Sequence, residues 1–317
     1  MKVTTIGFAG ILLLAAVFAA GPGCSSSEEA VKSSPEQLFA KAKALYDDGD
    51  YLGAINEFTV LTLQAQGSAV GAEAQFYLAE CRYQREEYVL AAYEYGVFKR
   101  SYAANAKVAD AQFKLAMSYY NLSPKFALDQ QYTRRAIDEF QTFVEYYPGN
   151  PLAVQADEKI KELNTRLAQK QYETARLYVK MEYYRAALLS YDQVIEKFHD
   201  TEYAPLAYLD KVQLLVDRER YEEAFAEVKR FIARYPNSPL IGRGEELKET
   251  IDAELNRIVE EALERKIALV EIIPGKGSGQ LKKKVLRFLN QGHIKKLYHR
   301  VEKDDKNFGR IFIHFKF

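Results

Sequence analysis

Phe39-x-x-Ala42-x-x-x-Tyr46 decides the fold of this chain, because the same pattern returns twice at a fixed distance. The copies are Phe76/Ala79/Tyr83 and Phe113/Ala116/Tyr120, each displaced by 37 residues from the one before. Offsets of three and seven put the three side chains on one face of a helix, and alanine admits a neighbouring helix at close range. A fixed period of this length predicts a repeat architecture.

A second pattern marks the other half of each repeat: an aromatic residue, two spacers and an alanine. It occurs as Tyr51–Ala54, Tyr88–Ala91, Tyr184–Ala187 and Tyr221–Ala224, and the third copy has Thr133 before Ala136. Together the two halves resemble the tetratricopeptide (TPR) repeat of paired antiparallel helices. We therefore expect a mostly α fold, in which five helix pairs over residues 35–240 stack into a solenoid with a concave surface.

Two insertions interrupt the regular spacing of the repeats. Residues 121–131 have the composition of a loop inside the third repeat, and residues 153–178 read as one long helix without a break. Proline, which cannot continue a helix, follows the third and fifth repeats at positions 148 and 236.

The chain before residue 35 has the features of a targeting segment. Lys2 precedes an apolar run over residues 6–20, which is shorter than the roughly 20 residues that span a bilayer, so we expect a signal peptide over residues 1–23. Gly21-Pro22-Gly23-Cys24 and the serines after it resemble the lipobox at which bacterial lipoproteins are cut and acylated. Cys24 is then the lipidated residue and residues 24–34 a tether. The alternative is ordinary signal-peptidase cleavage with an incidental thiol.

Charge and composition exclude several classes of protein. Residues 25–264 hold 29 Lys and Arg against 40 Asp and Glu, a net charge of −11, whereas residues 265–317 hold 14 against 4, a net charge of +10. A hydrophobic content of 48% is typical of a globular protein, and two cysteines are too few for a disulfide framework. The four histidines show no metal-ligand spacing, and no catalytic constellation or cofactor fingerprint stands out. We expect neither an enzyme nor a bound cofactor.

The segments 136–148 (AIDEFQTFVEYYP) and 168–178 (AQKQYETARLY) narrow the family. With the lipid-ready cysteine, five repeats and the third-repeat loop, they resemble the BamD family over about residues 20–240. These are lipoproteins of the outer-membrane β-barrel assembly machinery. The resemblance implies a scaffold on the periplasmic face of the outer membrane, anchored in lipid through acylated Cys24. It also implies binding of unfolded outer-membrane proteins and docking on the POTRA domains of the barrel subunit BamA. A different periplasmic TPR adaptor, resembling CpoB, is the alternative.

The first helices of the repeats carry the candidate client-binding residues, because these helices line the concave side of TPR proteins. Aromatic rings offer adaptable packing to an extended segment with alternating aromatics. The candidates are Phe39, Lys43, Tyr46, Phe76, Glu80, Tyr83, Phe113, Lys114 and Tyr120. The alternative is that these rings only pack helix against helix.

The later repeats resemble the BamA-contacting half of the family, and their cations are candidates for pairing with acidic POTRA residues. They are Arg176, Lys180, Arg185, Arg218 and Arg220. A charge-rich helix is also an ordinary solvated face, in which single pairs contribute little. For Cys81, inside a helix of the second repeat, we expect a buried apolar thiol.

Residues 241–317 are predicted to form a linker helix and a small basic α+β tail. We expect a helix over 245–266, strands near 267–273, 298–301 and 310–317, and a basic helix over 280–291. The run Ile272-Ile273-Pro274 and the glycines after it resemble part of a small MutS-related (Smr) domain, whose relatives act on nucleic acid. The upstream Asp-Leu-His-Gly element of that family is absent here, so a nucleic-acid-binding protein led by the tail is the less favoured alternative, and we expect no nucleic acid partner. Backbone N–H groups at a helix start can hold an anion. The candidate residues for such a site are Gly275, Lys276, Gly277, Ser278 and Gly279.

Overall fold

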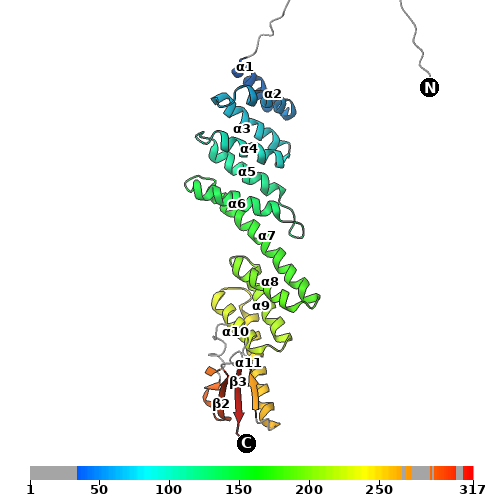
Figure 1. Ribbon diagram of the computed structural model, residues 1–317, viewed down its shortest axis with the longest axis vertical. Coiled ribbons are helices and arrows are strands. Elements are labelled where there is room, and N and C mark those ends of the chain that lie inside the picture. Colours follow the sequence, from blue (N-terminus) through cyan, green and yellow to red (C-terminus); the bar gives the residue numbers. More distant parts are fainter. Residues whose placement is uncertain (1–33, 266–268, 273–285, 288, 305–309, 317) are drawn as a thin grey trace, which may run out of the picture.

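A computed structural model describes residues 34–265, 269–272, 286–287, 289–304 and 310–316 of the chain. The described part is an elongated stack of helices with a small sheet at its C-terminal end (Figure 1). The helices are α1 Pro35–Asp47, α2 Tyr51–Gln64, α3 Ala69–Gln84, α4 Tyr88–Ser101, α5 Val108–Leu122, α6 Gln131–Tyr146, α7 Ala153–Lys180, α8 Tyr184–Lys197, α9 Tyr203–Asp217, α10 Tyr221–Arg234 and α11 Ile241–Glu264.

Helices α1 to α10 form five antiparallel pairs, so the prediction of a solenoid of five helix pairs is confirmed. The small residues of both repeat patterns lie at the helix crossings: Ala42, Ala54, Ala79 and Ala116 are fully buried. Tyr51, Tyr88, Tyr184 and Tyr221, which opened the second pattern, are the first residues of α2, α4, α8 and α10. The stack begins at Ser34, whose side chain and Gln37 form a capping box at the start of α1.

Four of the tight turns between paired helices place a residue in the left-handed region of backbone conformation. Gly49 adopts a φ of 81° between α1 and α2. The equivalent residue 37 positions later is Glu86, with a φ of 60°, and Glu182 and Glu219 adopt φ values of 60° and 56° in later turns. A side chain in this region costs energy that glycine avoids, so pairing of the helices must hold these glutamates in place.

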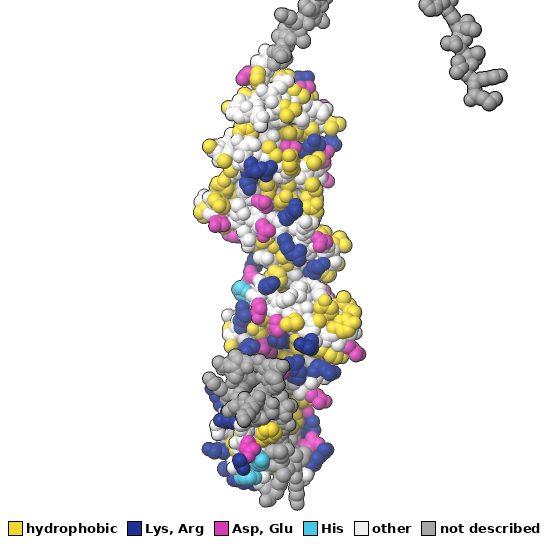
Figure 2. Space-filling model, viewed as in Figure 1, with side chains coloured by type: hydrophobic (Ala, Val, Ile, Leu, Met, Phe, Trp, Pro, Cys, Tyr) yellow, Lys and Arg dark blue, Asp and Glu magenta, His cyan; other side chains and the backbone are white. Residues whose placement is uncertain are grey.

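Helix α7 is long, with 28 residues, because it packs against both α6 and α8. Its first half packs on α6 through Ala156 and Leu163, and its second half packs on α8 through Tyr172 and Ala175. The second half repeats the opening pattern, since Tyr172/Ala175/Val179 has the same offsets of three and seven. The molecule narrows where α7 runs between its two neighbours (Figure 2).

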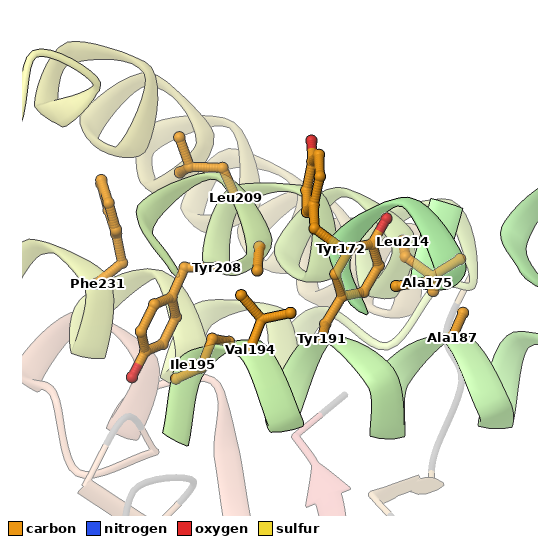
Figure 3. Packing of buried hydrophobic residues seen from close by; sticks show 11 residues of the cluster. Tyr172, Ala175, Ala187, Tyr191, Val194, Ile195, Tyr208, Leu209, Leu214 and Phe231 are labelled. Atoms are coloured by element: carbon orange, nitrogen blue, oxygen red, sulfur yellow. The ribbon is translucent and has the colours of Figure 1, made fainter. Parts of the chain in front are cut away.

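The core of the fourth and fifth pairs is built from aromatic and aliphatic side chains of α7 to α10. Tyr191, Val194 and Ile195 of α8 lie in a row beneath Tyr172 of α7 (Figure 3). Tyr208 of α9 faces Phe231 of α10, with ring centroids 6.2 Å apart. Because each helix packs mainly on the next one in the chain, contacts are local and the stack grows pair by pair.

The third-repeat insertion forms a loop over residues 123–130, as predicted, and polar contacts hold it. Gln130 is buried, and its amide donates to the carbonyls of Lys125 and Leu128, each at 3.0 Å. Arg166 and Lys170 of α7 donate to the loop carbonyls of Ser123 and Leu128. The loop is therefore fastened to the long helix beside it.

The tail contains a three-stranded antiparallel sheet of order β1-β3-β2. The strands are β1 Leu269–Ile272, β2 Tyr298–Asp304 and β3 Arg310–Phe315, and the short helix α13 is Gly292–Lys295. Ile311, Ile313 and Phe315 of β3 pack with Leu289 and Ile294. Strand β2 is longer than we predicted. Helix α11 also differs from the expected linker, because its residue Ile251 is buried against Val212 and Val228 of the fifth pair.

Candidate functional site

Lysine ammonium groups lie over tyrosine rings along the first helices of the stack. At the N-terminal end, Lys43 lies 5.4 Å from the ring centroid of Tyr46 and 5.2 Å from that of Tyr77 on α3. These distances suit attraction between a cation and a ring face. Lys43 also pairs with Asp47 at 2.5 Å. Burial and the nearby charge of Glu80 raise the pKa of Tyr46 to about 12, so this phenol is neutral at physiological pH.

The next cation is Lys107, which reaches back from the start of α5 to the second helix pair. Its ammonium lies 4.9 Å from the ring centroid of Phe76 and 5.1 Å from that of Tyr77. It pairs with Glu73 of α3 at 2.5 Å. Tyr77 therefore lies between two lysines that come from different repeats.

An ion pair between Lys114 and Glu80 links the third helix pair to the second. Glu80 is 7% exposed, accepts a hydrogen bond from the hydroxyl of Tyr95, and pairs with Lys114 at 3.3 Å. The same ammonium lies 4.8 Å from the ring centroid of Tyr83. A buried carboxylate is stable only with such partners, so Glu80 organises this part of the surface.

Tyr120 carries the same arrangement one repeat further along. The ammonium of Lys159, on α7, lies 4.2 Å from its ring centroid and donates a 2.8 Å hydrogen bond to its hydroxyl. That hydroxyl donates in turn to the carboxylate of Glu162. We call this set the lysine-capped face: Tyr46, Tyr77, Tyr83, Tyr120, Lys43, Lys107, Lys114 and Lys159.

The three phenylalanines of the opening pattern lie deeper than the tyrosines. Phe113 is buried against Phe140 and Phe143, and Phe39 and Phe76 are half-buried on core clusters. Phe113 is thus reachable only if its helix pair opens. Glu80, expected as a polar contact, already has two partners inside the protein.

Sequence reasoning missed Tyr77, Lys107 and Lys159. None of these residues stands in either repeat pattern. The contact of Lys107 with Glu73, for example, spans 34 residues and depends on how the helix pairs stack.

The candidate docking cations lie at the turns of the fourth and fifth pairs. Arg218 stacks over the ring of Tyr184 at 4.6 Å, and Arg220 pairs with Glu223 at 2.7 Å. Arg176 pairs with Glu173 at 3.2 Å, and Lys180 is exposed in the last turn of α7.

Arg185 and Arg220 both line a depression of about 490 Å³ between α8 and α10. Leu188 and Leu189 line it together with Lys211 of α9. Lys211 is largely buried and bridges Asp192 and Glu227 at 2.6 and 3.4 Å. The lining therefore combines leucines with three cations, Arg185, Lys211 and Arg220, and three acids, Asp192, Glu223 and Glu227, so its formal charges balance.

Other predicted residues lie outside the described part of the chain. These are Cys24 and the candidate anion site, Gly275, Lys276, Gly277, Ser278 and Gly279. Within the described residues, no group of histidine, cysteine and acidic side chains has the arrangement of a metal site, and none of the helices is long and apolar enough to cross a membrane.

Comparison with known protein families identifies the family of the helical stack. A family model described as an outer membrane lipoprotein, YfiO, matches residues 31–215, which is more than half of the chain. The chain belongs to the YfiO family of outer membrane lipoproteins. The model of the Smr domain matches residues 243–316. Both parts of the resemblance seen in the sequence are thus confirmed, and the YfiO match includes the whole lysine-capped face.

Individual proteins are also similar to this chain. The outer membrane protein assembly factor BamD of Rickettsia prowazekii is 25% identical over 218 residues, which are 68% of this chain and 87% of that protein. Among solved structures, the TPR2AB domain of yeast Sti1 in its pHSP90 complex is 17% identical, with a TM-score of 0.38, and the match covers 73% of this chain and 87% of that one. A TPR protein of Thermus thermophilus is 16% identical with a TM-score of 0.28, covering 70% of this chain and 99% of that one.

Proposed function

We propose that this protein is a lipid-anchored scaffold of the outer-membrane β-barrel assembly machinery. It binds unfolded outer-membrane proteins on the lysine-capped face and docks on the POTRA domains of a barrel subunit through the fourth and fifth helix pairs. It performs no chemistry of its own. The observation that carries this proposal is the family match over residues 31–215 together with the BamD relative.

The chemistry of the lysine-capped face suits an extended polypeptide. Tyrosine rings offer flat apolar contact and a hydroxyl, and the lysines between them offer donors to main-chain carbonyls and carboxylates. Each lysine has a carboxylate nearby, Asp47, Glu73, Glu80 or Glu162, so the face is close to neutral. Such a surface favours aromatic residues at alternate positions of a strand over a strongly charged client.

The fourth and fifth helix pairs offer a depression that suits a protein partner with both apolar and charged groups. Arg185 and Arg220 border the depression between α8 and α10, and Leu189 is exposed beside them. An apolar anchor with a rim of charged groups is the usual composition of a protein interface. We assign this depression to the POTRA contact.

Affinity isolation tests the proposal. The tagged chain is extracted from membranes in mild detergent, and we expect a barrel protein with POTRA domains to be recovered with it. The double variant Arg185→Glu/Arg220→Glu should lose that protein, whereas Arg134→Glu on α6 should retain it. Recovery of a different set of envelope proteins would favour a CpoB-like adaptor. A cytoplasmic location with bound nucleic acid would favour a role led by the Smr-like tail.

Counting thiols tests the anchor. Burial raises the pKa of the Cys81 thiol to about 12, so it reacts only after unfolding. Acylation consumes the thiol of Cys24. Protein extracted from membranes should therefore show no thiol that reacts with a disulfide reagent when folded and one when unfolded. One reactive thiol in the folded protein would show that Cys24 is free.

A further inference from the structure

The second helices of the first two pairs expose several large apolar side chains. Helix α2 exposes Leu52, Val60 and Leu63, the last at 77%, and helix α4 exposes Val89, Leu90 and, at 61%, Tyr93. Leu52 and Val89 are 37 residues apart, so they occupy the same position in successive pairs. We call these six side chains the apolar outer face. They belong to the second helices, whereas the lysine-capped face belongs to the first helices.

The second helices of the first two pairs contain fewer charged residues than those of the later pairs. Helix α2 contains one charged residue, Glu57, whose carboxylate pairs with Lys41, and α4 contains three. Helices α6, α8 and α10 contain five, four and six. In Figure 2 the end of the molecule with α1 to α4 shows mainly hydrophobic and neutral side chains, and charged ones are more frequent toward the other end. A surface helix with almost no charge is unusual for a face that meets only water.

We propose that the apolar outer face rests on the lipid surface to which the N-terminus is anchored. This inference depends on the membrane anchoring proposed above. Nine residues lie between Cys24 and Ser34, the cap of α1, so the chain takes ten residue steps from one to the other. Fully extended, these steps span about 35 Å at most, so an anchor at Cys24 keeps the start of α1 within that distance of the membrane and the first helix pairs near it.

The chemistry of the face fits a bilayer interface. Aliphatic side chains enter the boundary between head groups and acyl chains, and tyrosine is enriched at that depth. The low charge of these helices reduces the cost of bringing ions to lipid and also leaves few of the pairs that would select a protein partner. A bilayer contact on α2 and α4 leaves the lysine-capped face of α1, α3 and α5 free for a client.

The chain contains no tryptophan, so an introduced indole reports its surroundings without background. The test uses the full chain from residue 25 with a histidine tag in place of Cys24, bound to phosphatidylcholine vesicles that contain a nickel-chelating lipid. This tether makes the result independent of whether Cys24 is acylated in the cell. Part of the phosphatidylcholine carries bromine near the top of its acyl chains, which quenches an indole that reaches them.

The informative variant is Tyr93→Trp, and its matched control is Tyr83→Trp in the same helix pair on the lysine-capped face. We expect brominated lipid to remove roughly half of the Tyr93→Trp fluorescence, because a side chain at this interface enters about 5–10 Å. The control should keep its fluorescence. Equal quenching of both variants, or quenching of neither, would overturn the proposal, and the second result would leave a protein partner as the occupant of the face.

A second substitution checks that the face acts as a unit. Adding Leu63→Glu to Tyr93→Trp places a charge on the other helix of the apolar outer face and should abolish most of the quenching. Adding Val154→Glu, at an exposed apolar position on α7, should not. Circular dichroism of each variant shows whether the helices are intact, so a loss of quenching by a folded protein is attributable to the face. Unchanged quenching in the Leu63→Glu protein would contradict the proposal.

Discussion

The ammonium of Lys114 lies 3.3 Å from the carboxylate of Glu80, so the third helix pair supplies the counter-ion for an acid buried in the second. The hydroxyl of Tyr95 donates to the other oxygen of that carboxylate. The contact therefore couples two repeats at the centre of the lysine-capped face. In a stack held by contacts between neighbouring repeats, such a link makes the unfolding of adjacent helix pairs more cooperative.

Removing this counter-ion should destabilise the protein. Lys114→Met leaves Glu80 with only the Tyr95 hydroxyl, and we expect the free energy of unfolding to fall by about 1–2 kcal/mol. The value is below that of fully buried pairs because the Lys114 side chain is 34% exposed and water reaches it. Urea unfolding followed by circular dichroism measures the change.

The matched control is Lys248→Met on α11, where the lysine pairs with Asp252 at the surface. It should change the free energy of unfolding by less than about 0.5 kcal/mol. Glu80→Gln added to Lys114→Met should recover part of the loss, because a neutral amide needs no counter-ion. Equal effects of the two lysine variants would mean that Glu80 is solvated.

The tyrosines of the lysine-capped face should contribute directly to client binding. Tyr46→Ala combined with Tyr83→Ala removes two rings, and we expect about a tenfold loss of affinity for a peptide with alternating aromatics, which is about 0.7 kcal/mol per ring. Fluorescence anisotropy of a labelled peptide measures the affinity. The control pair, Tyr93→Ala and Tyr146→Ala, removes two exposed rings elsewhere. If affinity is unchanged while the helices remain folded, the rings serve only packing.

The sequence predicted the helix pairs well because their boundaries depend on local patterns. Tyr51, Tyr88, Tyr184 and Tyr221 each begin a helix, and the unbroken helix expected over residues 153–178 is α7. Contacts between repeats were not predictable in the same way. Lys107 reaches Glu73 only because the third pair stacks on the second at a particular angle, which no local pattern encodes.

The outward-facing residues were also missed, for a related reason. Periodicity identifies the side of a helix that faces the core and treats the other side as solvent. It therefore did not single out Leu63 or Tyr93, which lie away from the core of their helix pairs. Their importance appears only when exposure is known and the charge of successive second helices is compared.

Alkaline pH should destabilise the folded protein through its buried tyrosines. Burial raises the pKa of Tyr46 to about 12, and burial and the charge of Glu80 raise that of Tyr95 still further. An unfolded tyrosine titrates near 10. The folded state thus holds protons that the unfolded state releases, and this stabilisation is complete below about pH 10 and is lost as the pH rises through 12.

The chain has 23 tyrosines and no tryptophan, so phenolate absorbance follows this titration cleanly. We expect the exposed tyrosines to ionise first and the buried ones to ionise together with the loss of helix, in a steep step above pH 10. Tyr95→Phe should make that step shallower. A smooth titration of all phenols near pH 10, with the helices still intact, would contradict the burial of these side chains.

Helix α11 packs so closely on α10 that one glycine is required at the contact. A Cβ atom added to Gly244 would lie 2.5 and 2.7 Å from two ring carbons of Phe231, which is fully buried. Either the ring or the helix must shift, and we expect Gly244→Ala to lower the free energy of unfolding by about 1–3 kcal/mol. At Gly242, two residues earlier in the same helix, a Cβ atom meets nothing within 4 Å. Gly242→Ala should therefore be neutral or stabilise by up to about 1 kcal/mol, because alanine favours the helix. Urea unfolding compares the two variants, and a stabilising Gly244→Ala would show that α11 stands further from the fifth pair.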